Sequence, residues 1–187
     1  MNRIEPLQPP YDPVVGAQLE RMVPPRVPPI GLFRTFARNL PMTEAMNGWG
    51  SYELSRNLSL GMRDREIVID RTCARCHCEY EWGVHIAFFA ERVCLTPAQV
   101  TSLTHGVSTD GCWVDDRDRL LIASVDALHD TATLPDDLWD RLATEFTEPE
   151  LLDLTMLIGW YHAISFTANA AQVDLEAGAP TFADVVH

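Results

Sequence analysis

The chain has 187 residues, of which 47% are hydrophobic and 22% are charged, and its formal net charge is −13. This composition supports one buried core and argues against nucleic acid as a partner, because phosphates would be repelled. No apolar run reaches the ~20 residues of a membrane-spanning helix. Prolines also interrupt the region where a signal peptide would have its apolar segment. We therefore expect a soluble cytoplasmic protein with no membrane partner.

The N-terminal region contains most of the thirteen prolines. Proline lacks a backbone donor and interrupts helices, so residues 1–29 are predicted to form a Pro-rich N-terminal arm with at most one short helix, near residues 14–22. Such an arm often wraps around a partner subunit. Residues 30–187 are predicted to form a single all-helical domain.

Apolar residues recur at helical spacing along this domain, and no segment shows convincing strand character. Thr43 and Thr96 are predicted N-caps, and Pro41 is predicted to end the first helix. A faint similarity between the segments that begin at Glu66 and Glu150 predicts two related helical halves. The fold class is therefore all-α. The predicted helices cover residues 31–39, 43–58, 63–77, 78–93, 97–104, 115–129, 135–146 and 149–176.

The candidate site lies in residues 65–85, which hold three of the five cysteines and two of the six histidines. If the chain is helical from Cys78 onwards, Cys78, Glu81 and His85 share one face, because their spacing is i, i+3, i+7. The unperturbed pKa of a histidine side chain lies near neutrality, so His85 is the natural proton carrier. Glu81, one turn earlier, and Glu66, on the helix packed alongside, are predicted to set its tautomer and proton affinity.

Aromatic residues near this stretch suggest a pocket. Tyr80, Trp82 and Tyr161 are predicted to bind substrate by lining a small apolar pocket over the imidazole, with the Tyr161 hydroxyl as the group that reaches the site. The alternative is that these rings only pack in the core. Asp70 and Glu79 are interpreted as solvated helix charges.

Clustered cysteines in a reducing compartment more often serve redox or metal chemistry than a disulfide framework. Cys73 and Cys76 have Cys-x-x-Cys spacing and Cys78 follows, so two of these could form a redox pair; otherwise they are structural thiols. No metal site is predicted, because the soft ligands are crowded into one segment without a distal Cys-x-x-Cys or histidine pair. Cys94 and Cys112 are interpreted as small buried hydrophobes.

The stretch resembles the motif of the carboxymuconolactone decarboxylase family, which includes the alkyl hydroperoxidase D (AhpD) proteins. In that motif, a glutamate lies twelve positions before the first cysteine of Cys-x-x-Cys, and a histidine lies four positions after the second. Glu66, Cys78 and His85 match the glutamate, the first cysteine and the histidine, whereas Glu81 occupies the second cysteine position. Tyr-Glu-Trp ahead of the histidine is similar to one subgroup of the family. The similarity covers roughly residues 40–176.

This resemblance implies an all-helical AhpD-like bundle that assembles as a homotrimer or homohexamer, with the site near subunit contacts. It also implies one of two chemistries. In the hydroperoxidase branch, the second cysteine attacks the peroxide; here Glu81 stands in its place, and a carboxylate cannot form a sulfenic acid or a disulfide. In the decarboxylase branch, a histidine and carboxylates perform acid/base chemistry without a cofactor.

The sequence leaves three hypotheses for function open. In the first, His85 is the general acid or base, tuned by its two glutamates, of a cofactor-free enzyme acting on a small organic acid, a lactone or a hydroperoxide. In the second, an antioxidant thiol hydroperoxidase uses Cys78 with Cys76 or Cys73. In the third, an oligomer binds a small molecule without turning it over.

Overall fold

The computed structural model describes residues 2–186, and within them all regular structure is helical, which confirms the predicted fold class. None of these helices combines the length and apolar character that crossing a membrane requires. The elements in chain order are α1 (Pro13–Arg21), α2 (Gly31–Phe36), α3 (Leu40–Glu53), α4 (Met62–Arg75), α5 (Glu79–Phe89), α6 (Pro97–His105), α7 (Asp116–Thr131), α8 (Asp136–Glu145), α9 (Glu148–Ala171) and the 3-10 helix η1 (Phe182–Val185).

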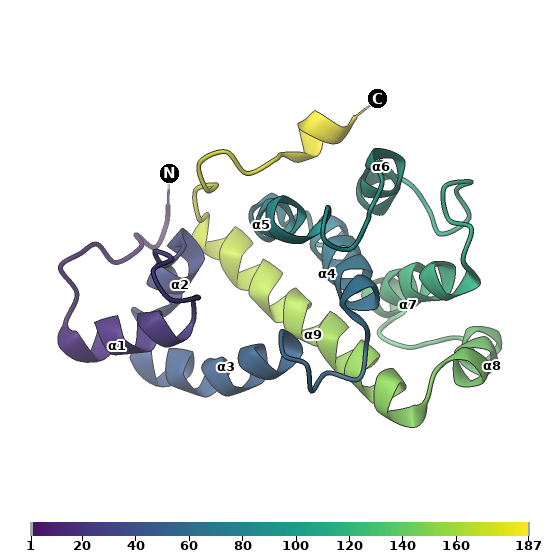
Figure 1. Cartoon of the computed structure of the whole chain (residues 1–187), viewed down its shortest axis with the longest axis horizontal. Coiled ribbons are helices and arrows are strands. Elements are labelled where there is room, and N and C mark those ends of the chain that lie inside the picture. The colour runs from purple at the N-terminus through teal and green to yellow at the C-terminus, as the bar shows by residue number, and fades with distance from the viewer. Residues whose placement is uncertain (1, 187) are drawn as a thin grey trace.

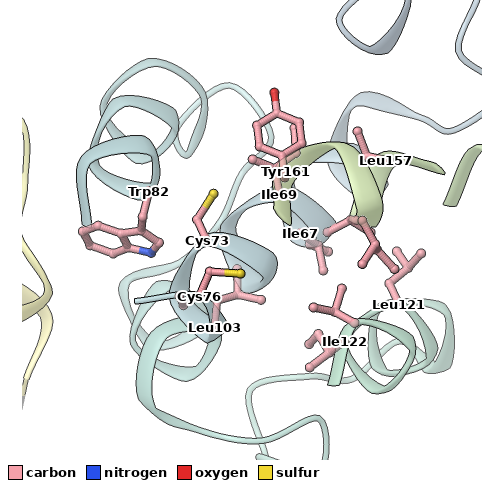
Figure 2. Packing of buried hydrophobic residues seen from close by; sticks show 14 of the residues in the cluster. Ile67, Ile69, Cys73, Cys76, Trp82, Leu103, Leu121, Ile122, Leu157 and Tyr161 are labelled. Atoms are coloured by element: carbon pink, nitrogen blue, oxygen red, sulfur yellow. The ribbon is translucent and has the colours of Figure 1, made fainter. Parts of the chain in front are cut away.

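Helix α4 lies at the centre of the molecule and packs against α5, α6, α7 and α9 (Figure 1). Every residue of α4 from Asp64 to Ala74 is buried, although several of them are charged. Ile67 from α4, Leu121 from α7 and Leu157 from α9 meet in the hydrophobic core (Figure 2). Burying each such side chain stabilises the fold by about 1.5–3 kcal/mol.

Several buried charges of α4 find partners on the surrounding helices. Arg71 donates to both carboxylate oxygens of Asp126 on α7, at 2.8 and 2.9 Å. It also donates to the carbonyls of Leu103 and Gly106 at the end of α6, each at 3.0 Å. A buried guanidinium is tolerated only when its donors are paired in this way. Arg71 therefore fixes α4 relative to both α6 and α7.

Several helix boundaries differ from their predicted positions. Asn39 rather than Thr43 is the N-cap of α3, and Pro41 lies in the first turn of that helix instead of ending the preceding one. Proline suits a first turn because its missing N–H would have no intrahelical partner there. Helix α3 ends at Glu53 and α9 at Ala171, both earlier than predicted. By contrast, the helix predicted from Thr96 begins there.

The N-terminal segment contains α1, in the region where one short helix is predicted. Three backbone hydrogen bonds attach the segment to its own chain: Arg3 N and Ile4 N donate to Ala171 O at 2.8 and 3.4 Å, and Leu7 N donates to Arg34 O at 3.2 Å. The segment therefore lies against α2 and the end of α9. Its wrapping around a partner subunit stays a prediction.

We expect Trp113→Ala to lower the free energy of unfolding by about 3–5 kcal/mol. Trp113 is fully buried, and its Nε1 donates to Ser102 Oγ at 2.8 Å, so the substitution leaves a cavity and removes a buried hydrogen bond. Ser102 Oγ keeps its own bond to Asp110 Oδ2 at 2.7 Å. Trp139→Ala is the matched control, because Trp139 is 45% exposed. Urea unfolding followed by circular dichroism measures the free energy of unfolding of both variants. Equal losses of stability would contradict the prediction.

Candidate functional site

His85 is buried on α5 with polar groups at both ring nitrogens. Its Nδ1 lies 2.8 Å from Glu66 Oε2 on α4. Its Nε2 lies 3.2 Å from the Tyr161 hydroxyl on α9 and 3.5 Å from Glu81 Oε1 on its own helix. The first two distances are hydrogen-bond lengths, so the ring is fixed at both ends. The structure thus brings Glu66, Glu81 and Tyr161, all three singled out in the sequence, around His85.

Glu66 is held from its other side by Arg65. The guanidinium donates to Glu66 Oε1 through Nε at 2.7 Å and through Nη2 at 2.6 Å. The same guanidinium lies over the Phe89 ring, 5.2 Å from its centroid. Each carboxylate oxygen of Glu66 therefore has one charged or polar partner, which fixes the oxygen that faces His85.

The charges around His85 determine its protonation state. Burial by itself lowers the pKa of His85, but the adjacent Glu66 carboxylate, assisted by Glu81, raises it to about 10. At neutral pH the ring is therefore an imidazolium, whose Nδ1–H donates to Glu66 and whose Nε2–H faces Tyr161 and Glu81. A ring in this state is ready to give a proton away rather than to accept one.

Asp70 is buried beside this pair, which corrects its interpretation as a solvated helix charge. Asp70 is 1% exposed. One carboxylate oxygen of Asp70, one carboxylate oxygen of Glu66 and one ring nitrogen of His85 all lie within 4.8 Å of one another. Burial and the Glu66 charge raise the pKa of Asp70 well above its usual value. In the sequence, the i, i+4 spacing of Asp70 from Glu66 already indicates that both carboxylates share one face of the helix.

Tyr80 and Trp82 make their observed contacts away from the imidazole, and their predicted part in a substrate pocket stays a prediction. The Tyr80 hydroxyl accepts from the backbone of α2 at 3.0 Å and donates to a glutamate of the C-terminal segment at 2.5 Å. The Trp82 ring packs edge-on against Phe182, with centroids 5.0 Å apart, and Figure 2 shows it well separated from Tyr161. Both residues hold the C-terminal segment against the helices.

The clustered cysteines are free and buried. Cys78 is the N-cap of α5 rather than a residue on its helical face. Burial raises the pKa of Cys78 and of Cys76 to about 11, and that of Cys73 well above its usual value. All three thiols interact with the Ser165 hydroxyl of α9, which opposes this rise only in part. They are therefore protonated at neutral pH, and a protonated thiol is a poor nucleophile.

Two carboxylate oxygens in this region, Glu81 Oε2 and Asp70 Oδ1, are buried without a hydrogen-bond partner among the described residues. Buried polar atoms are nearly always paired, so these two are available to a bound molecule. Two surface grooves border the N-terminal segment, but neither is lined by His85 or by Glu81. His85 itself is buried, with 4% of its surface exposed.

No protein-family model and no curated protein matches the chain by sequence. Solved structures do match in fold. An uncharacterized peroxidase-related protein from Silicibacter sp. TM1040 has a TM-score of 0.78 at 16% identity over 96% of both chains. The debrominase Bmp8 has a TM-score of 0.77 at 18% identity over 98% of both chains.

A third similar structure is that of ATU0492 from Agrobacterium tumefaciens, a protein of unknown function that has been proposed to be the antioxidant defence protein AhpD. Its TM-score is 0.67 at 18% identity, over 76% of this chain and 96% of that chain. Together these structures show that the chain has an AhpD-like fold, as the resemblance of its central stretch implies. At such low identity the comparison establishes the fold alone.

Proposed function

We propose that this protein is a proton-transfer enzyme of the carboxymuconolactone decarboxylase type, in which His85 is the general acid. The observation that carries this proposal is the buried imidazole, held between Glu66 at 2.8 Å and Tyr161 at 3.2 Å. Glu66 and Glu81 keep the ring protonated, and Tyr161 orients its Nε2–H. The resemblance of the motif supports a small organic acid or a lactone as substrate, with no cofactor.

In the proposed reaction, the bond between the substrate carbon and its carboxylate breaks and CO2 leaves. The electron pair of that bond remains on the substrate as an enolate. His85 Nε2–H then gives its proton to the enolate carbon, which is far more basic than the imidazolium. The neutral imidazole that results remains hydrogen-bonded to Glu66, and a proton from water then restores the imidazolium.

A thiol hydroperoxidase that uses Cys78 with Cys76 or Cys73 is the second candidate. The observation in its favour is that fold neighbours are named for peroxidase-related or antioxidant functions. Burial and protonation of all three thiols, together with Glu81 at the second cysteine position, oppose it. This function would require an opening that exposes one thiol to the peroxide.

The proposal is tested by turnover on a panel of lactone acids, keto acids, and hydroperoxides supplied with a dithiol. The panel includes 2,3,4-tribromopyrrole, because a variant of the debrominase Bmp8 has been seen in complex with it. We compare the wild type with Cys78→Ser and with Cys112→Ser as the matched thiol control. CO2 release that survives Cys78→Ser supports acid catalysis.

Other outcomes of the panel would contradict acid catalysis by His85. Hydroperoxide consumption that Cys78→Ser abolishes and Cys112→Ser preserves would establish the thiol function instead. Saturable binding measured by calorimetry, with no turnover of any compound, would identify a binding protein, which is the third hypothesis.

We also propose that α9 mediates self-association of the chain. Its outer face exposes the large apolar side chains of Leu152, Met156 and Phe166, which are 68%, 48% and 60% exposed. The smaller Gly159 and Ala163 lie exposed between them along the same stripe. A stripe of this kind at heptad-like spacing is typical of a helix that packs against another chain. This supports the homotrimer or homohexamer that the resemblance implies.

Phe166→Glu is expected to lower the molar mass in solution from that of a trimer or hexamer toward that of a monomer. The reason is that a carboxylate placed in the apolar contact must be desolvated. Thr167→Glu adds the same charge at the next exposed position and is expected to leave the mass unchanged. Light scattering coupled to size exclusion measures the molar mass of both variants. An unchanged molar mass for Phe166→Glu would show that this face of α9 is not the self-association surface.

A further inference from the structure

A second cluster of ligating side chains lies where the end of α4 meets α7 and α9. His129 Nδ1 is 2.9 Å from His162 Nε2 and 4.0 Å from Cys76 Sγ. All three atoms lie within 4.8 Å of one another. Cys76 is the C-cap of α4, His129 belongs to the last turn of α7, and His162 lies on α9. Three helices thus direct one thiol and two imidazoles toward a common point.

The spacing of these atoms fits a tetrahedral zinc ion. Zn–N bonds of about 2.0–2.1 Å and Zn–S bonds of about 2.3 Å place neighbouring ligand atoms about 3.3–3.6 Å apart. The N–N distance of 2.9 Å and the N–S distance of 4.0 Å lie on either side of that range. Small rotations of the side chains are sufficient to reach it. Imidazole and thiolate together are the donor set that zinc prefers.

The hydrogen bonds around the cluster also orient its ligands. His162 Nδ1 is 2.8 Å from the carbonyl of Ile158, and since a carbonyl only accepts, this nitrogen carries the proton. The lone pair of His162 Nε2 is therefore directed at the other two ligands, as in histidines that bind metals. Asn169 Nδ2 donates to the Cys76 carbonyl at 2.8 Å, which fixes the end of α4.

The nearest cation is compensated by two carboxylates. Arg75 precedes Cys76, and its guanidinium pairs with Asp130 and, at 3.5 Å, with Asp126. Both carboxylates belong to α7, the helix that also carries His129. Their charges offset the repulsion that Arg75 would otherwise exert on a bound cation.

We propose that Cys76, His129 and His162 bind one Zn²⁺, with water completing the tetrahedron. Binding replaces the S–H bond of Cys76 by a Zn–S bond and releases that proton to solvent, while both imidazoles bind in their neutral form. The ion ties α4 to α7 and α9, immediately before the left-handed turn at His77 that leads into α5. The site is distinct from His85, and the proposal does not depend on the function proposed there.

Sequence reasoning predicts no metal site because no histidine pair accompanies the cysteines. The structure supplies that pair from the distant positions His129 and His162, which lie 53 and 86 residues beyond Cys76 (129 − 76 and 162 − 76). Of the ligands considered from sequence, only Cys76 belongs to the cluster. Its other members come from helices whose packing against the end of α4 no local pattern indicates.

The test is a titration of chelator-treated full-length protein with Co²⁺, followed by displacement with Zn²⁺. We expect one Co²⁺ per chain and a thiolate-to-cobalt charge-transfer absorption. Cys76→Ser should abolish that absorption, and His129→Gln and His162→Gln should each weaken binding about 10-fold or more. The matched controls Cys112→Ser and His105→Gln should bind as the wild type does. Circular dichroism verifies that every variant is folded.

Alkylation provides a second readout. Bound Zn²⁺ should lower the rate at which a maleimide alkylates Cys76 in proportion to the fraction of sites that remain empty, while the exposed Cys94 reacts at an unchanged rate. An absence of the charge-transfer absorption in the wild type, or binding unaffected by all three substitutions, would overturn the proposal. Binding that is lost in His85→Gln but retained in His162→Gln would also overturn the proposal, since the ion would then be bound by Glu66, Asp70 and His85.

Discussion

Replacing His85 by glutamine is expected to lower kcat of the proposed proton-transfer reaction by about 10²–10⁴-fold, the usual contribution of a positioned general acid. Glutamine can still hydrogen-bond to Glu66 and fill most of the space, but its amide has no proton to release near neutral pH. Because the chemical step is affected rather than the binding of substrate, KM should change much less than kcat.

Steady-state kinetics on the best substrate of the panel measures this effect. His105→Gln is the control, since His105 is an exposed histidine at the end of α6 and lies outside the site. If His85→Gln keeps the wild-type kcat while its fold is intact, His85 is not the proton donor. A matching loss in both variants would indicate an indirect effect on the assay or on stability.

Glu66→Gln is expected to lower the pKa of His85 by several units, from about 10 in the wild type. The substitution keeps a hydrogen-bonding side chain of the same size but removes the negative charge that does most to stabilise the imidazolium. Burial, which opposes the charged ring, is then balanced by Glu81 alone. Imidazole ¹⁵N shifts followed by NMR from pH 5 to about 10 report the protonation of each ring nitrogen directly.

The free energy of unfolding should depend on pH differently in the wild type and in Glu66→Gln, because the pKa of His85 differs between them. The folded pKa of His85 lies above its unfolded value of about 6.5, so its ionisation stabilises the fold fully below that pH. This stabilisation, about 1.4 kcal/mol per pKa unit, is lost as pH rises toward 10. The gap in free energy of unfolding between wild type and Glu66→Gln should therefore narrow over that window. A wild-type His85 that titrates near 6.5 would contradict the acid role.

Local sequence patterns were sufficient for the helical class and for several details of it. Thr96 is followed by proline and, three residues on, by Gln99, and in the structure these form the predicted helix start with a capping box. Capping involves residues within one turn, so a short window of sequence contains all the necessary information. Spacing likewise placed Glu81 one turn before His85, because positions i and i+4 share a helical face.

Tertiary packing decided which side chains belong to the site. Asp70 looks like a surface charge in sequence, but four helices surround α4 and leave it no solvated face. Tyr80 and Trp82 lie within the motif, yet the C-terminal segment packs against them and engages their side chains. His129 and His162 meet Cys76 only because α7 and α9 cross the end of α4. Sequence patterns extend over one or two turns of a helix, whereas burial and the convergence of distant residues depend on how whole helices pack.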